Sequence, residues 1–198
     1  MALINGTKKK KSSFFLTTKT ALKRGFLFLT GDRPKESTFR DLFESIPFFA
    51  NHEDRAKEKA ESIGKNATYE WLDVTDKSSI QKVVDKYEKI DILINNAAKD
   101  PKVKKGGGLT PDSRFETMTD EYWQEGIDAC VNGTFLCSQI VSNKMLETGG
   151  GVILNISSDL GVISPDQRIY RKEGVDENMQ NVKPITYSAA KWAVVGMT

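Results

Sequence analysis

The sequence predicts an α/β fold of three layers, in which helices cover both faces of a doubly wound parallel β-sheet. Short, continuous apolar segments alternate along the chain with longer segments of helical pattern, as expected when buried parallel strands are joined by helices. The 198 residues are 38% hydrophobic and 28% charged, which suits a single domain with its own core. We therefore interpret residues 1–198 as one domain.

The expected elements follow from local signals. Short apolar runs bounded by polar or turn residues predict strands, and longer segments with a helical pattern of apolar residues predict helices. Asp76 is an expected N-cap, and glycines mark expected helix ends. The expected strands cover residues 2–4, 26–30, 68–72, 91–94 and 151–157. The expected helices cover residues 13–24, 53–63, 77–87 and 120–146.

Composition excludes several classes of function. The 29 basic and 27 acidic side chains leave a net charge of +2, which gives no general attraction to nucleic acid or membranes. No apolar stretch is long enough to span a bilayer, and we find no secretory signal. Cys130 and Cys137 form no disulfide framework and have no zinc-ligand spacing. We expect a cytoplasmic protein without a metal site.

The sharpest chemical signal is the segment ITYSAAKWAV. Tyr187 and Lys191 are four residues apart, so on a helix they share one face. A phenol normally has a pKa near ~10, and a nearby ammonium favours the phenolate. The pair is therefore a candidate general acid and base. Taken alone, the same spacing also describes an ordinary surface tyrosine and lysine.

Three further polar groups follow expected strands, at the edge where open parallel sheets bind ligands. The segment YEWLDVTD ends a strand at Asp73, DILINNAA ends one at Asn95 and Asn96, and ILNISSDLG ends one at Ser157 and Ser158. Each also has a plain structural interpretation, as a helix cap, turn residues or loop polar groups. Their occurrence in this order together with the Tyr–Lys pair favours a functional site.

These motifs resemble those of the short-chain dehydrogenase/reductase family. The resemblance implies a Rossmann fold and hydride transfer between a nicotinamide cofactor and a secondary alcohol or ketone. It makes Tyr187 the acid/base, Lys191 the residue that binds the nicotinamide ribose and lowers the pKa of Tyr187, and Ser158 the group that holds the substrate oxygen. The cofactor-binding positions that it implies are Gly6, Asp32, Asp73, Val74, Asn95, Asn96, Ala97, Tyr187 and Lys191.

The chain departs from the family pattern at several positions. Ala98 stands where a glycine is usual, and Cys130 stands where an active-site asparagine is usual. We expect Cys130 to be a small core residue rather than a nucleophile. The chain between Ser158 and Tyr187 is also longer than in most members.

This extra segment, residues 162–186, is called the insert below. We expect it to cover the substrate pocket, where cations of the insert would meet a polar substrate, although a solvated loop is the plainer interpretation. With the segment before it, the insert resembles members linked to bacterial surface-sugar synthesis. The insert's candidate contacts are Arg168, Tyr170, Arg171 and Lys172.

The first turn of the expected fold is unusual. Aligned on Gly6, Lys10 and Ser12 occupy positions where the family has glycines that admit the cofactor pyrophosphate. The segment is therefore either a cofactor-binding turn of another shape, a turn that binds the cofactor poorly, or a basic tail. A reading-frame slip near the lysine run is a further alternative. Asp32, at the end of the second expected strand, favours NAD over NADP, although Arg33 weakens that preference.

The sequence also ends within or just after the Tyr–Lys helix, whereas family members continue with further strands. We therefore expect a fold that is incomplete at its C-terminus. The resemblance also implies a homo-oligomer, because many members of the family are dimers or tetramers. The favoured function is an NAD-linked oxidoreductase acting on a small alcohol or ketone, with NADP as the alternative cofactor. The rival is a degenerate or fragmentary Rossmann module that acts by binding alone.

Overall fold

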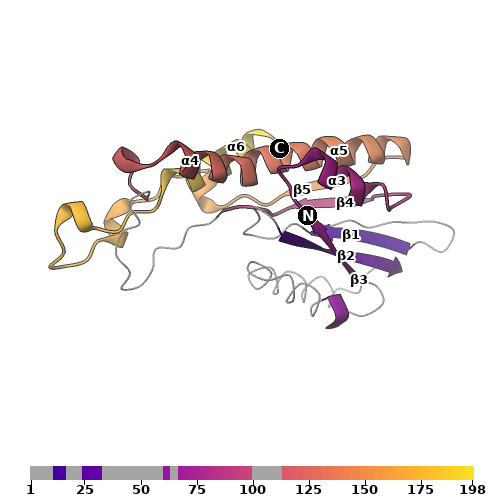
Figure 1. The fold of residues 1–198 in the computed structure, drawn as a ribbon, viewed down its shortest axis with the longest axis horizontal. Helices are drawn as coiled ribbons and strands as arrows, with labels where there is room; N and C mark the ends of the chain where they lie inside the picture. The colour runs from indigo at the N-terminus through magenta and orange to yellow at the C-terminus, as the bar shows by residue number, and fades with distance from the viewer. Residues whose placement is uncertain (1–10, 17–23, 33–59, 63–66, 100–112) are drawn as a thin grey trace.

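A computed structural model of the chain describes residues 11–16, 24–32, 60–62, 67–99 and 113–198. These residues form a five-stranded sheet with the strand order β3-β2-β1-β4-β5 (Figure 1). This is the order typical of a doubly wound sheet. The strands are β1 (Lys11–Leu16), β2 (Arg24–Asp32), β3 (Ala67–Leu72), β4 (Ile92–Asn95) and β5 (Val152–Asn155).

The sheet is mixed rather than fully parallel, which corrects the expected fold class. β1 pairs in parallel with β4, and β4 with β5, but β2 is antiparallel to both of its neighbours, β1 and β3. Four strands therefore point the same way and only β2 is reversed among the described strands. The carboxyl ends of β1, β3, β4 and β5 share one edge of the sheet, whereas β2 ends at the opposite edge.

The expected helix over residues 13–24 is wrong, because residues 11–16 form β1. The segment SSFFLTT is rich in aromatic and β-branched residues, which favour a strand. Once β1 and β2 are adjacent strands, residues 17–23 are too few for the crossover that parallel neighbours need. The two strands must therefore pair as antiparallel neighbours. The expected strand over residues 2–4 lies outside the described residues.

The later elements agree with the sequence prediction. The helix α3 (Lys77–Val84) is capped by Asp76, whose carboxylate accepts the Ser78 amide at 2.8 Å. The expected helix over residues 120–146 is α4 (Asp120–Ile127), a π-helical turn (Asp128–Asn132) and α5 (Gly133–Glu147). The chain then enters β5 through Gly149 and Gly150, both with positive φ. The last helix is α6 (Ile185–Gly196).

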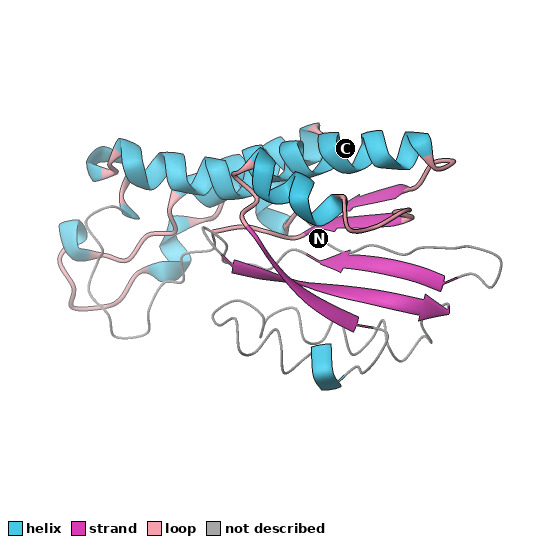
Figure 2. Cartoon of the chain, turned by 45° about the vertical axis from the view of Figure 1, so that its right-hand side comes forward, coloured by secondary structure: helices cyan, strands magenta, loops and turns pink. Residues whose placement is uncertain are grey.

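The helices α3, α4, α5 and α6 lie along one side of the sheet in both views (Figures 1 and 2). Buried side chains of β3, α3, β4 and α5 form the main core, in which Leu72, Ile80 and Leu93 are fully buried. The described residues thus establish a helical layer on a sheet, and they do not establish the third layer that the sequence predicts. Within these residues, no helix is long and apolar enough to cross a membrane.

The two thiols provide a test of this core. Cys137 is fully buried on α5, and burial raises its pKa from 9.0 to about 12. Burial also raises the pKa of Cys130. The unfolded chain releases these protons at lower pH than the folded chain does, so the free energy of unfolding is expected to fall as pH rises above 9.

We expect Cys137→Ala to lower stability at pH 7, through the lost packing, but to flatten the decline between pH 9 and 10.5 by up to about 1.4 kcal/mol per pH unit. Urea unfolding at several pH values measures both effects. Equal slopes for the two proteins would show that the Cys137 thiol titrates normally in the folded state.

Candidate active site

The carboxyl edge of the sheet brings together polar residues from separate strands. Asn95 ends β4, and its side-chain amide donates to Asn155 Oδ1 on β5 at 2.9 Å and to Ser138 Oγ on α5 at 2.8 Å. The backbone amide of Ile156 donates to the Asn95 carbonyl oxygen at 2.8 Å, which extends the pairing of the two strands. Asn95 therefore joins β4, β5 and α5 at the edge where the candidate catalytic groups lie.

The helix α6 is attached to this edge by two hydrogen bonds that involve Lys191. Lys191 is only 3% exposed, and its Nζ donates to the carbonyl oxygen of Ile156 at 2.6 Å, just beyond β5. The hydroxyl of Ser157 donates to the backbone carbonyl oxygen of Lys191 at 3.0 Å. Ser157 thus has a structural contact, and the expectation that it is less involved in catalysis than Ser158 stays a prediction.

Tyr187 lies beside Lys191 and is 7% exposed. The Lys191 Nζ is 5.8 Å from the centroid of the Tyr187 ring, which is within the range of a cation–π contact. The phenol packs in a small cluster with Ala98, Cys130, Ala190 and Val194. The predicted helical face that joins Tyr187 and Lys191 is therefore present, and it faces the interior.

Two departures from the family pattern lie in this same cluster. Ala98, which stands where a glycine is usual, is 1% exposed and belongs to the same buried cluster as Tyr187. Cys130 occupies the π-helical turn between α4 and α5 and is buried, as expected for a core cysteine. A π-helical turn is often found at a functional site.

Ser158 follows β5 and begins a 3₁₀ turn, Asp159–Gly161. Its hydroxyl donates to Asp159 Oδ1 at 2.7 Å, and its oxygen accepts the Leu160 amide at 3.3 Å. The hydrogen bond from Ser158 is the largest cause of a lowered pKa at Asp159. In this arrangement, the Ser158 hydroxyl must turn away from Asp159 before it can donate to a substrate oxygen.

Asp73 and Val74 follow β3 and have local partners. Asp73 Oδ1 accepts hydrogen bonds from the amide and the hydroxyl of Thr75, at 2.9 and 2.7 Å. The Val74 side chain is buried in the main core against Gly133. The Asp73 backbone is bonded as well, because its amide donates to Ser79 Oγ at 2.9 Å and its carbonyl oxygen accepts the Asp76 amide at 3.2 Å. Asn96 and Ala97 continue from β4 and are both buried.

One predicted cofactor position, Asp32, does not join this site. Asp32 ends the reversed strand β2 and is paired with Lys11 at the start of β1, so it lies at the opposite edge of the sheet. Gly6 lies outside the described residues. Because residues 11–16 form a strand, the helix whose N-terminus would follow the Gly6 turn is not formed there.

Sequence reasoning missed Lys183, which stands four residues before Tyr187. Its Nζ lies 4.6 Å from the centroid of the Tyr187 ring, closer than that of Lys191. The charge of Lys183 also contributes, as a minor cause, to the lowered pKa of Asp159. The sequence contains this second Tyr–Lys spacing of four. Pro184 lies between the two residues and immediately precedes α6, so Lys183 is outside the helix and the helical-face argument does not apply to it.

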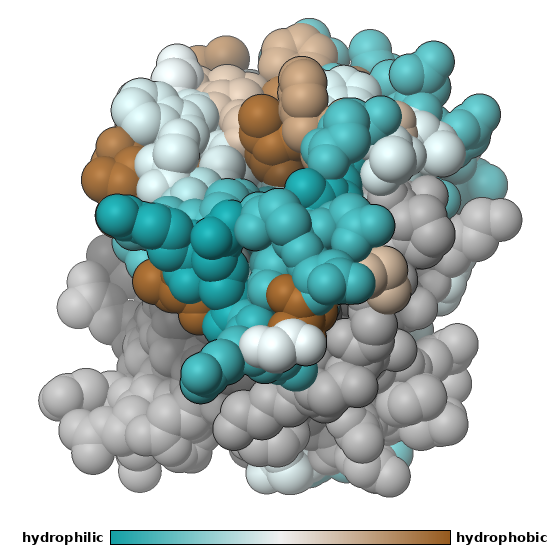
Figure 3. All heavy atoms as spheres, turned by 90° about the vertical axis from the view of Figure 1, so that its left-hand side faces the viewer, coloured by the Kyte–Doolittle hydropathy of each residue, from teal (hydrophilic) through white to brown (hydrophobic). Residues whose placement is uncertain are grey.

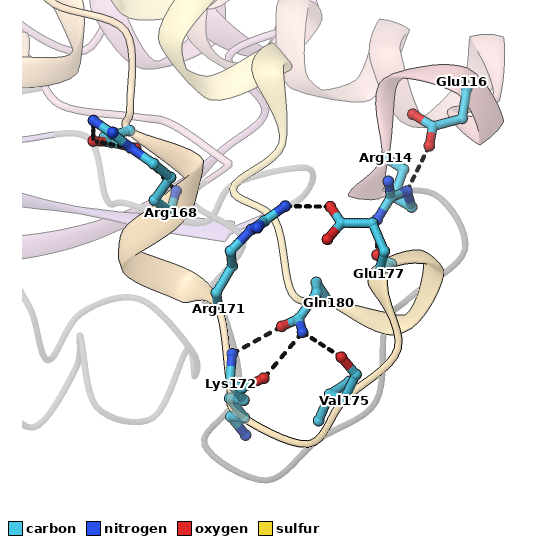
Figure 4. A network of polar contacts seen from close by, with 9 residues as sticks. Arg114, Glu116, Arg168, Arg171, Lys172, Val175, Glu177 and Gln180 are labelled. Carbon is cyan, nitrogen blue, oxygen red and sulfur yellow. Dashed lines mark hydrogen bonds and ion pairs between the residues drawn. The ribbon is translucent and has the colours of Figure 1, made fainter.

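The insert lies at one end of the molecule, where the exposed surface is mostly hydrophilic with scattered apolar side chains (Figure 3). Its cations largely pair with its own acids, since Arg168 binds Asp166 and Arg171 binds Glu177 (Figure 4). The lysine Lys172 is bound through its backbone amide and carbonyl to the Gln180 side chain. The guanidinium groups expected to meet a substrate are thus engaged within the insert.

The geometry and sequence identify the class of protein. The family model for short chain dehydrogenase matches residues 43–171, more than half of the chain. The chain therefore belongs to the short-chain dehydrogenase family, oxidoreductases with a Rossmann-like fold that binds NAD(P). The match ends before Tyr187 and Lys191, so the assignment to the family does not depend on these two residues.

Individual relatives agree with this assignment. The chain is 34% identical over 131 residues to an NAD-dependent glycerol dehydrogenase of Listeria innocua, covering 64% of this chain and 41% of the relative. It is 35% identical over 119 residues to a 3-oxoacyl-[acyl-carrier-protein] reductase of Synechocystis, covering 60% and 38%. The chain thus spans about two fifths of the length of these relatives.

A solved structure is also similar to a large part of the chain. It is a short chain dehydrogenase of Leptospira borgpetersenii with bound NAD⁺, with a TM-score of 0.51 and 30% identity, covering 64% of this chain and 44% of that one.

Gly161 provides a test of how α6 is attached. A Cβ atom at this position would lie 2.4 Å from the Ser157 hydroxyl and 2.9 Å from the backbone carbonyl oxygen of Lys191. We expect Gly161→Ala to separate α6 from the end of β5 and to lower the free energy of unfolding by about 1–3 kcal/mol, as measured in urea.

The control is Gly196→Ala in α6, where an added Cβ meets nothing within 4 Å. This change is expected to be neutral or to stabilise by up to about 1 kcal/mol, because alanine is the better helix former. A Gly161→Ala protein as stable as the unmodified chain would contradict the close packing of α6.

Proposed function

We propose that this protein is an NAD-dependent oxidoreductase that interconverts a secondary alcohol and a ketone. The observation that carries the proposal is the buried Tyr187–Lys191 pair, held beside the end of β5 by the bond from Lys191 to the Ile156 carbonyl oxygen. A phenol beside a fixed ammonium is suited to transferring a proton at a substrate oxygen.

In the proposed mechanism, Tyr187 exchanges a proton with the oxygen of the alcohol or ketone. Lys191 favours the phenolate through its fixed positive charge and also holds the cofactor ribose. Ser158 donates its hydroxyl to the same substrate oxygen, after turning away from Asp159. The nicotinamide, when bound, supplies or accepts the hydride.

The carboxyl edge of the sheet has groups that suit this cofactor. Asn95 Oδ1 is buried and accepts no hydrogen bond from the described residues, so it is available to a donor on a ligand. Asn96 and Ala97 continue this edge beside the Tyr187 cluster and are the proposed lining of the cofactor site. The NAD-dependent relative and the NAD⁺-bound structure support NAD as the cofactor. Asp32 does not add to that support, because it lies at the other edge.

A binding-only module is the second candidate. It is favoured by the Ser158–Asp159 hydrogen bond, which occupies the expected substrate-binding hydroxyl, and by Cys130 in place of an asparagine. The free, buried thiols support a reducing compartment such as the cytoplasm for either candidate. The surface-sugar link stays a prediction.

Cofactor binding is the first measurement. We expect NADH to bind saturably in a fluorescence titration and to bind more tightly than NADPH. Asp32→Ala is expected to leave the ratio of the two dissociation constants unchanged, because Asp32 lies away from the carboxyl edge. Tighter NADPH binding would refute the cofactor preference, and a changed ratio in the variant would place Asp32 against the cofactor.

Turnover separates the enzyme from the binding module. We expect Tyr187→Phe to reduce kcat by about 10²–10⁴-fold while NADH still binds, because only the proton-transferring hydroxyl is lost. Tyr87→Phe is the matched control, because its hydroxyl lies beside that of Thr68 and not at the candidate site, and it is expected to retain full activity. Equal rates for Tyr187→Phe and the unmodified chain would exclude Tyr187 from the mechanism.

A further inference from the structure

The candidate acid/base contacts a second lysine besides the one on its own helix. The Lys183 Nζ lies 4.6 Å from the centroid of the Tyr187 ring, and the Lys191 Nζ lies 5.8 Å from it. Both distances are within the range in which an ammonium is attracted to an aromatic ring. Lys191 belongs to α6, whereas Lys183 belongs to the insert. Tyr187 is therefore close to positive charges from two separate parts of the chain.

The backbone of Lys183 is fixed where the insert joins α6. The Gln167 side chain accepts the Lys183 amide at 2.9 Å and donates to the Lys183 carbonyl oxygen at 3.0 Å. One carboxamide thus satisfies both backbone groups of Lys183. Pro184 follows, is buried and immediately precedes α6. The Lys183 side chain therefore starts from a fixed point next to the helix that carries Tyr187.

The other surroundings of Tyr187 make an ionised phenol unfavourable. The ring is 7% exposed, and a buried negative charge is unfavourable unless a positive charge compensates it. Cys130, in the π-helical turn, is a neutral thiol near pH 7, because burial raises its pKa. The side chains that pack in this cluster from the other elements carry no charge, and they are Ala98, Ile127, Val131, Leu160, Ala190 and Val194.

One carboxylate opposes the lysines. Asp159 lies in the 3₁₀ turn after β5, and the charge of Lys183 is a minor cause of its lowered pKa. Asp159 is exposed, so water and salt weaken its electrostatic effect, whereas the buried Tyr187 is shielded from both. The attraction between Lys183 and a negative charge on Tyr187 therefore outweighs the opposing effect of Asp159.

We propose that Lys183 is a positioning residue for the reaction, whose ammonium beside the Tyr187 ring favours the phenolate together with Lys191. The inference rests on the proposed function, because it concerns the proton transfer assigned to Tyr187. Lys183 acts through Tyr187 and does not itself exchange a proton with the substrate. The insert thus contributes a charge to the chemistry, although its arginines are engaged with its own acids.

The ionisation of Tyr187 can be measured without substrate or cofactor. In the full chain, Tyr187 is replaced by 3,5-difluorotyrosine and its ionisation is followed by ¹⁹F NMR. The fluorines make the phenol more acidic, so it titrates while both lysines are charged. Lys183→Gln is expected to raise the midpoint of this titration by about 0.5–1.5 pH units, because the anion loses a nearby cation. Lys183→Arg, which keeps the charge, is expected to restore most of the difference.

A matched control separates this local effect from a change in net charge. Lys82→Gln removes the same charge from α3, which packs on β3 and α5, and is expected to leave the midpoint unchanged. An unchanged midpoint in Lys183→Gln would overturn the inference. An equal rise in Lys82→Gln or in Lys183→Arg would overturn it as well, because the effect would then not depend on a positive charge at position 183.

Turnover tests whether the same charge acts in the reaction. With NAD⁺ and propan-2-ol, Lys183→Gln is expected to lower kcat about 3–30-fold on the acid side of the pH profile and to change it little at the alkaline plateau. An equal loss at every pH would indicate a structural defect and overturn the inference. The expected NMR shift in a chain that oxidises no propan-2-ol would uphold the action of Lys183 on Tyr187 and count against the proposed function.

Discussion

The site depends on one buried ammonium group. An unpaired charge in the interior is strongly unfavourable, so Lys191 must reach an acceptor, and the carbonyl oxygen of Ile156 supplies it at the end of β5. This contact fixes the distance between α6 and the sheet. The position of Tyr187 on the same helix follows from it, as does the requirement for a glycine at position 161, where helix and turn leave no room for a side chain.

The later half of the fold was predictable because its signals are local and agree with one another. Asp76 caps α3, and apolar strands lead into polar residues at Asp73, Asn95 and Asn155. Around residues 11–32 the local signals conflict, since a helix suits the expected connection while aromatic and β-branched residues favour a strand. The direction of β2 follows from its short connection to β1, and this becomes evident only once residues 11–16 are assigned to a strand rather than to a helix.

The candidate site was predictable where spacing alone determines the geometry. Tyr187 and Lys191 share a helical face, and Ser158 follows a strand, so the sequence brings all three to one edge. The sequence could not predict that the Ser158 hydroxyl bonds Asp159, since a rotation about one bond decides it. The contact of Lys183 with Tyr187 and the burial of Ser188 depend on how the insert folds back, which involves distant parts of the chain.

The insert is held mainly by two glutamine side chains that bind backbone groups. Gln167 bridges to Lys183, and Gln180 bridges Lys172 to Val175 (Figure 4). Carboxamides carry no charge and do not titrate, whereas the exposed pairs Arg168–Asp166 and Arg171–Glu177 weaken as ions screen them. The backbone shape of this segment is therefore expected to change little with ionic strength or pH, because the side chains that bridge its backbone carry no charge.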